Sequence, residues 1–406
     1  MTVDYDVLII GGGLVGGSLA CALGAENLRI GLIEAYPFKS AQQPSYDDRS
    51  IALAYGSRTI LDGIGLWPAL SAHTTAIKKI HVSDRGHFGF TRLDCRNNDL
   101  DALGYVVETR SMGQVFAESL DRLNNIDLIC PAELQALNCG DETALATIRH
   151  DGKLEQLRSR LVIGADGGDS TVRRLCAVSS RIWDYGQSAI ITNITPERPH
   201  NHIAYERFTD SGPLALLPMS EQRCSLVWTV RNQDVGDALA LDDSDFLRRL
   251  QQRFGSRLGK LTQCGKRQSY PLRLIRARRH NTPRLALIGN AAHTLHPIAG
   301  QGFNLGIRDV AALAQVIRDA HEQGRDIGST AVLDEYEQWR TADQRRVSMM
   351  TDTLVRIFSN NFPPLILARN AGLIALDILP PFKQLLTRQA AGLAGRLPRL
   401  ARGLPL

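Results

Sequence analysis

The chain has 406 residues, of which 44% are hydrophobic, so it can bury a large core and form two or three domains. Its 47 Lys and Arg residues and 42 Asp and Glu residues leave a net charge of +5. The basic residues are dispersed rather than gathered in one stripe, which argues against a nucleic-acid-binding protein.

The N-terminus lacks the basic region and long apolar run of a secretory signal. No segment reaches about 18 uninterrupted apolar residues, so no membrane-spanning helix is expected. The seven cysteines include no C-x-x-C pair and are interpreted as reduced thiols without a metal site. We therefore expect a cytoplasmic protein, with peripheral attachment to the inner membrane left open.

The first predicted elements form a strand, a turn, a helix and a second strand. An apolar run at 7–10 leads into glycines and a small-residue helix from about Leu14. A second apolar run at 30–33 ends at Glu34. This order is typical of a parallel sheet.

The turn carries the pattern Gly11-x-Gly13-x-x-Gly16. The first glycine permits a tight turn, the second lets the backbone approach a pyrophosphate, and the third lets helix and strand pack closely. The helix N-terminus favours the phosphates, and Glu34 can accept hydrogen bonds from a ribose. The pattern predicts a dinucleotide site without distinguishing FAD from NAD; the alternative is a glycine-rich turn without a ligand.

Two further apolar runs end in glycine, at 160–167 and at 284–293. A long helix is predicted from near Gly300 past Ala320, and the chain after about Thr330 is predicted to be helical to its end. Strand-like stretches bounded by turn residues lie between these segments, at 80–83, 202–208, 214–218 and 224–230.

The predicted fold class is α/β: a Rossmann-like domain with an inserted antiparallel β-sheet and a helical C-terminal region. The expected cofactor-binding domain comprises residues 1–75, 105–177 and 270–330, the substrate domain 76–104 and 178–269, and the helical region 331–406.

Three motifs together resemble the class A FAD-dependent aromatic monooxygenases, the para-hydroxybenzoate hydroxylase superfamily. They are Gly11 to Gly16 with Glu34, the stretch Gly164-Ala165-Asp166-Gly167-Gly168-Asp169, and the stretch from Gly289-Asn290-Ala291-Ala292-His293 through Gly300-Gln301-Gly302-Phe303-Asn304. The resemblance spans about the first 340 residues. It implies an FAD-dependent hydroxylase that uses O2, with NAD(P)H as a transient co-substrate.

The resemblance assigns roles to the third motif. Asn290 would face the ribitol of the flavin, and Pro297 would shape the wall above the ring. The backbone of Gly300, Gly302, Phe303 and Asn304 would face the pyrimidine edge, where a helix N-terminus stabilises negative charge. The family usually has Asp where this chain has Asn290, which leaves open how firmly FAD is retained.

Other residues match family positions near the cofactor, each with a structural alternative. Arg49 would reach the pyrophosphate, or form a surface salt bridge to Asp47 or Asp48. Arg110 and Gln114 would lie near the cofactor. Asp166 would support cofactor and nicotinamide handling, or cap a helix near Ser170. His296 would be a catalytic base, or a structural hydrogen bonder.

Within the superfamily, the chain resembles the ubiquinone-biosynthesis hydroxylase branch, on the stretches 81–87, 206–209, 212–218 and 295–306. Asn290 also occurs in that branch. The implied substrate is a polyprenylated phenol, and the implied partners are O2, other quinone-biosynthesis proteins and a membrane surface. Topology suggests substrate contacts from the inserted sheet, at Arg207, Phe208, Leu216, Pro218 and Trp228.

The C-terminus is compatible with a membrane surface. No acidic side chain follows Asp377, and five Lys or Arg residues follow it. Phe382, Leu385, Leu386, Leu393 and Leu397 would share one helical face; the alternative is a helix packed on the protein. Two other functions stay open: a hydroxylase of a small soluble phenol, and a catalytically silent scaffold of a quinone-synthesis complex.

Overall fold

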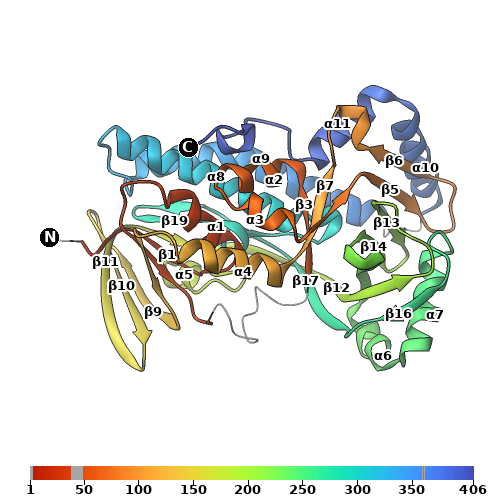
Figure 1. Ribbon diagram of the computed structural model, residues 1–406, viewed down its shortest axis with the longest axis horizontal. Coiled ribbons are helices and arrows are strands. Elements are labelled where there is room, and N and C mark those ends of the chain that lie inside the picture. Colours follow the sequence, from red (N-terminus) through yellow and green to blue (C-terminus); the bar gives the residue numbers. More distant parts are fainter. Residues whose placement is uncertain (1–2, 38–48, 359, 361) are drawn as a thin grey trace.

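The computed structural model describes residues 3–37, 49–358, 360 and 362–406. In this part of the chain the strands form an eight-stranded, a nine-stranded and a three-stranded sheet, with helices packed around them (Figure 1).

The eight-stranded sheet has a parallel centre. Its strands follow the order β18 (Asn281–Thr282), β19 (Leu285–Leu287), β11 (Lys153–Gly164), β1 (Tyr5–Ile10), β2 (Ile30–Ile33) and β8 (Ile126–Ile129). The pairs from β19 to β8 are parallel, as the continuous apolar runs predict for strands buried on both faces. The hairpin of β9 (Ala132–Cys139) and β10 (Ala144–His150) completes this sheet, because β10 pairs antiparallel with the first half of β11.

The two faces of β1 contact different layers. Val7 and Ile9 pack with α1 (Leu14–Leu23), α4 (Thr109–Leu120) and α8 (Gln301–Glu322). Leu8 and Ile10 pack instead with the β9–β10 hairpin and α5 (Thr171–Leu175). This alternation follows from the two-residue period of a strand.

The nine-stranded sheet is assembled from distant segments. Its order is β20 (His293–Thr294), β17 (Gln268–Ala277), β12 (Ser180–Pro196), β15 (Cys224–Arg231), β14 (Gly212–Pro218), β13 (Ile203–Thr209), β5 (Lys79–Asp84) and β6 (Phe90–Asp94), with β16 (Leu261–Cys264) beside β12. The expected antiparallel sheet is observed except that β13 and β5 are parallel. No hairpin joins these two strands, so nothing local forces the antiparallel direction.

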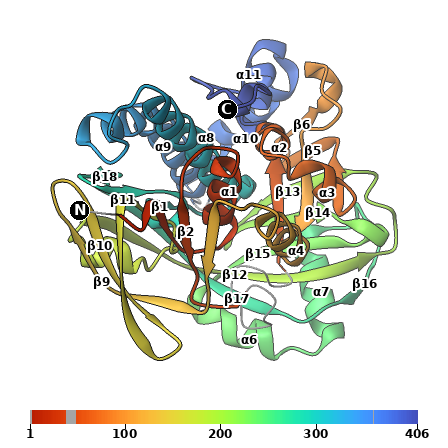
Figure 2. The ribbon, with the colours of Figure 1, turned by 60° about the vertical axis from the view of Figure 1, so that its left-hand side comes forward.

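The nine-stranded sheet lies between two helical layers. Figure 2 shows α6 (Val235–Ala240) and α7 (Asp243–Phe254) on one side, and α10 (Pro363–Ile378) and α11 (Pro380–Ala390) on the other. The three-stranded sheet runs β3 (Ser50–Ala54), β7 (Gly104–Glu108) and β4 (Thr74–Ile77). The short helices α2 (Tyr55–Gly63) and α3 (Trp67–Ser71) follow β3. The expected domain boundaries stay a prediction, and β17 crosses the one at residue 270.

The C-terminal region begins with α9 (Thr330–Phe358) and continues through α10 and α11. The prediction of helix to the end is wrong beyond Ala390, where glycines at 392 and 395 adopt positive φ angles and only a short turn follows. Among the described residues, no helix on its own has the length and apolarity of a membrane span. α10 and α11 reach that threshold only as a pair, which is bent by 95°.

Candidate functional site

A cavity of about 970 Å³ lies where the three motifs meet. The parallel strands β1, β2, β11 and β19 all end at the same edge of their sheet. The residues that follow them, Gly11, Glu34, Asp166 and Asn290, therefore line the same cavity. This edge of an open parallel sheet is where such folds bind ligands.

The glycine turn is too tightly packed for side chains. Gly11 has φ +102°, and a Cβ on it would lie 2.7 Å from the carbonyl oxygen of Ala165. A Cβ on Gly16 would lie 1.9 Å from the carbonyl oxygen of Gly11. Gly11 and Gly13 line the cavity, whereas Gly16 lies behind them and packs α1 against the turn.

Glu34 is held by the backbone of the turn beside it. The N–H of Gly12 donates to Oε2 over 2.6 Å, and the N–H of Tyr36 donates to Oε1 over 2.9 Å. The side chain is buried but contributes to the cavity wall. Each carboxylate oxygen keeps further acceptor capacity, which suits a ribose diol.

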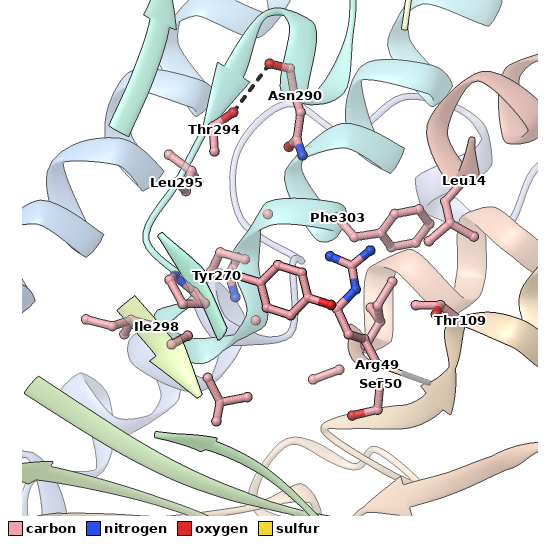
Figure 3. Close-up of a pocket in the computed structure, with 18 of the residues that line it drawn as sticks. Leu14, Arg49, Ser50, Thr109, Tyr270, Asn290, Thr294, Leu295, Ile298 and Phe303 are labelled. Carbon is pink, nitrogen blue, oxygen red and sulfur yellow. Dashed lines mark hydrogen bonds between the residues drawn. The ribbon is translucent and has the colours of Figure 1, made fainter. Parts of the chain in front are cut away.

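Arg49, which the sequence predicts at the cofactor, lines the cavity. Figure 3 shows Arg49, Tyr270, Asn290 and Phe303 around the cavity. The Arg49 guanidinium lies 4.8 Å from the centre of the Tyr270 ring, in cation–π geometry. Asp47 and Asp48, the alternative partners of Arg49, lie outside the described residues.

Asp166 lies at the cavity and also bonds the first turn of α5, so its role toward the cofactor stays a prediction. It lines the cavity, and its carboxylate accepts hydrogen bonds from the N–H of Val172 (3.0 Å) and the hydroxyl of Ser170. Ser170 in turn accepts from the N–H of Arg173 and is the N-cap of α5. These bonds fix the turn between β11 and α5.

The segment 290–304 forms one wall of the cavity. Asn290, Pro297, Gly300, Gly302 and Phe303 all line it. Gly300 is the N-cap of α8 and has φ +61°, so the helix begins at the cavity. Its N-terminus places positive partial charge there.

Asn304 lies behind that wall. Its amide oxygen accepts hydrogen bonds from the N–H of Ala54 (2.8 Å) and the hydroxyl of Ser57, and its amide nitrogen donates to the carbonyl oxygens of Ala52 and Gly300. Asn304 therefore joins β3 to the start of α8.

The structure does not bring His296, Arg110 or Gln114 into the cavity wall. His296 is fully buried with its ring edge-on to Tyr185, and burial lowers the pKa of His296 to about 4. Arg110 and Gln114 lie on the exposed face of α4, whereas Thr109, the first residue of that helix, lines the cavity. Their roles stay predictions.

The cavity continues as an apolar space over the nine-stranded sheet. Phe208 lines it, as the sequence predicts, but Arg207, Leu216, Pro218 and Trp228 do not. Leu216 and Trp228 pack with α7 on the opposite face of the sheet. The predicted contacts on β14 and β15 are thus one residue out of phase; Ala215, Leu217 and Val227 face the cavity instead.

Sequence reasoning missed the helices that close the cavity. They contribute Met350, Leu354, Phe358, Leu373, Leu376, Leu386 and Ala390 from α9, α10 and α11. It also missed Tyr270, Arg273 and Glu206. The one available signal was for Glu206, which lies between the apolar residues Ala204 and Phe208 at the two-residue spacing of one strand face.

The amino-acid sequence is similar to a known protein family and to several of its members. Residues 4–351 match the family model described as FAD binding domain. The chain is 42% identical over 404 residues to ubiquinone hydroxylase UbiL of Rhodospirillum rubrum, covering 99% of this chain and 93% of the relative. It is 33% identical to 3-demethoxyubiquinol 3-hydroxylase of Escherichia coli, covering 96% and 98%. A mitochondrial ubiquinone biosynthesis monooxygenase of Homo sapiens is 31% identical, covering 94% and 91%.

Solved structures share the fold at lower identity. Para-nitrophenol 4-monooxygenase PnpA from Pseudomonas putida superposes with a TM-score of 0.80 at 20% identity, covering 98% of this chain and 100% of the other. PqsL of Pseudomonas aeruginosa, in complex with 2-aminobenzoylacetate, gives 0.77 at 22% identity, covering 91% and 99%.

Proposed function

The chain belongs to the FAD-binding-domain family of flavoprotein monooxygenases, and from this premise we propose that it hydroxylates the ring of a polyprenylated phenol in ubiquinone biosynthesis. The observation that carries the proposal is the continuity of the cavity. It runs from the motif junction to an apolar space lined by the nine-stranded sheet and by α9 to α11, which suits an apolar ring and tail.

The residues at the junction fit FAD. Gly11 and Gly13 line the cavity beside the start of α1, where the pyrophosphate would lie. Glu34 would hold the adenosine ribose, and Arg49 would pair with the phosphates. Asn290 and the start of α8 would hold the flavin end. Bound FAD supplies the redox chemistry: electrons from NAD(P)H activate O2, one oxygen atom enters the ring and the other leaves as water.

The protein's own part is to bind, orient and exclude water. The apolar side chains of the sheet and of α9 to α11 keep the ring in a dry space, where charges interact more strongly than in water. Within the branch, the stretches 81–87, 206–209, 212–218 and 295–306 resemble 2-octaprenyl-6-methoxyphenol hydroxylase, so we propose that phenol as the first substrate to test.

The direct test uses protein reconstituted with FAD, NAD(P)H, isotopically labelled O2 and the prenylated phenol. We expect NAD(P)H oxidation that depends on the phenol, and a product that gains one labelled oxygen atom by mass spectrometry. A deletion strain should accumulate an intermediate lacking one hydroxyl. A folded protein that binds no flavin would support the scaffold alternative, and turnover of small phenols alone would support the soluble-substrate alternative.

A membrane surface is the proposed source of the substrate. Large apolar side chains are exposed on and beside α10 and α11, at Phe362, Leu367, Ile378, Leu379, Phe382 and Leu385. The inner sides of the same helices line the cavity through Leu373, Leu376 and Leu386. Arg388 adds an exposed positive charge, and no acidic residue follows Asp377. Apolar groups with cations nearby suit an anionic bilayer, into which a prenyl tail could extend.

The exposed apolar face of the C-terminal helix contains fewer residues than the sequence predicts. Phe382 and Leu385 are exposed, but Leu386 turns toward the cavity. Leu393 and Leu397 lie beyond the end of α11, and Leu397 packs against the main core.

Replacing Phe382 and Leu385 together with aspartate is expected to lower liposome binding by more than about 100-fold, because each buried side chain contributes about 1.5–3 kcal/mol to insertion. Flotation of the FAD-loaded protein with anionic vesicles measures this. Leu154, equally exposed on β11, gives the control variant Leu154→Asp, which should float like the wild type. Wild-type protein that stays off the vesicles with and without FAD would contradict the proposal.

A further inference from the structure

Glu206 lies in the middle of the sheet face that lines the cavity. The strand register places it beside Val82 of β5 and Ala215 of β14. The same row continues from Ala215 to Val227 of β15 and then to Ile191 of β12. All five side chains line the cavity, and Glu206 is the only charged residue in the row.

The carboxylate of Glu206 has no structural partner among the described residues. In the described ranges 3–37, 49–358, 360 and 362–406, no hydrogen bond or ion pair engages it. Other ionic groups nearby do have partners: the Arg369 Nε donates to Asp84 over 2.8 Å, and a terminal nitrogen of Arg207 donates to the carbonyl oxygen of Phe254 over 2.6 Å. An unpartnered carboxylate among apolar side chains destabilises a fold rather than holding it together.

The titratable groups on the surrounding elements leave Glu206 isolated. On β5, Asp84 is paired with Arg369 of α10, and His81 lies on the opposite face against Phe90. Other ionisable residues on the neighbouring strands include Lys79 and Asp94, which pair with each other, Arg92 on β6, Tyr205 and Arg207 on β13, Tyr185 on β12, and Tyr270 and Arg273 on β17; β14 has none. On the helices that cover the cavity, Asp352 pairs with Arg356 and Asp377 pairs with Lys383.

Burial alone raises the pKa of Glu206 to about 7, since no neighbouring charge contributes to the shift. Burial likewise lowers the pKa of His81 to about 4, which keeps that ring neutral near pH 7. Glu206 thus exchanges its proton in the range where a catalytic acid or base is most effective.

We propose that Glu206 is the catalytic base of the ring hydroxylation and accepts the proton of the substrate's phenolic hydroxyl. This inference rests on the proposed function. The phenolic O–H bond breaks, a carboxyl O–H bond forms, and the electron pair stays on the phenolate oxygen. The ring carbons ortho and para to that oxygen become more electron-rich, and so more reactive toward oxygen insertion. Glu206 returns the proton to the phenolate oxygen once the new hydroxyl is in place.

The test compares FAD-loaded wild type with Glu206→Gln, which keeps the shape and removes the base. In the wild type, kcat/KM should fall as the pH drops below about 7, because the free enzyme's base becomes protonated. In Glu206→Gln, kcat should fall by about 100-fold or more and the acid limb should disappear. Glu206→Asp should recover part of kcat. Glu118→Gln, the same change on the exposed side of α4, is the matched control and should keep both kcat and the limb.

A second measurement does not need turnover. Infrared difference spectra of the FAD-loaded wild type, recorded across neutral pH, should contain the carbonyl band of a protonated carboxyl that titrates near pH 7 and is missing in Glu206→Gln. Absence of that band overturns the inference. So does a Glu206→Gln enzyme that keeps kcat and the acid limb, or one in which only KM rises. If the wild type hydroxylates no prenylated phenol, the proposed function itself fails.

Discussion

Replacing Gly16 with alanine is expected to abolish FAD retention. The new Cβ would lie 1.9 Å from the carbonyl oxygen of Gly11 and 3.2 Å from the Cβ of Ala165. The close atom belongs to the backbone, so α1 must move away from the turn. That shift displaces the helix N-terminus and the backbone that would hold the pyrophosphate, and overpacking of this kind costs about 1–3 kcal/mol before the lost contacts are counted.

Flavin absorbance after purification and a titration of FAD measure the effect of Gly16→Ala; we expect affinity to fall by at least about 100-fold, close to 2.7 kcal/mol. Gly236→Ala is the matched control. Gly236 is also helical, in α6, and nothing lies within 4 Å of its added Cβ. Its free energy of unfolding should change by less than about 0.5 kcal/mol and FAD binding should not change. Wild-type affinity in Gly16→Ala would contradict the proposed cofactor site.

Replacing Asp309 with alanine is expected to lower the free energy of unfolding by about 3–5 kcal/mol. Asp309 is fully buried in α8 and accepts four hydrogen bonds. They come from Nε2 of His293 (2.6 Å), Nε of Arg340 (2.8 Å), Nε2 of Gln344 (2.9 Å) and the N–H of Gly289 (3.1 Å). Among the residues that the structure describes, the change leaves the buried guanidinium of Arg340 with Asp343 as its remaining ionic partner.

The same network predicts a pH dependence. Burial by itself would raise the pKa of Asp309, but His293 and Arg340 hold it well below its usual range. The unfolded state therefore binds a proton more readily than the native state at acidic pH. The contribution of Asp309 is complete at neutral pH and is lost progressively as the pH falls below about 4.

Urea unfolding of wild type, Asp309→Ala and Asp309→Asn at neutral and acidic pH checks both effects. Asp319→Asn, a half-buried site on the same helix, is the control and should stay within about 0.5 kcal/mol of wild type. Equal stability of Asp309→Ala and wild type at neutral pH would show that the network adds nothing. Because Gly289 and His293 flank Asn290, we also expect weaker FAD binding in Asp309→Ala.

The local features of the cofactor site could be predicted from the amino-acid sequence. The turn at Gly11 to Gly16, the apolar strands on either side and the acid at Glu34 depend on backbone conformations and spacings within about 30 residues. The positive φ of Gly11 and Gly300 is likewise a local requirement that glycine meets. Such features depend on local backbone conformation and do not depend on contacts with distant parts of the chain.

Only the tertiary structure decided which strand faces contact the cavity. β14 has nearly every residue buried because helices cover one face of its sheet and the cavity lies on the other. Apolar residues then occupy both faces, the period-two signal disappears, and the phase at Leu216 and Trp228 could not be read from the sequence. The parallel direction of β13 beside β5, the closure of the cavity by α9 to α11, and the isolation of Glu206 depend on contacts between segments far apart in the chain, which no local pattern records.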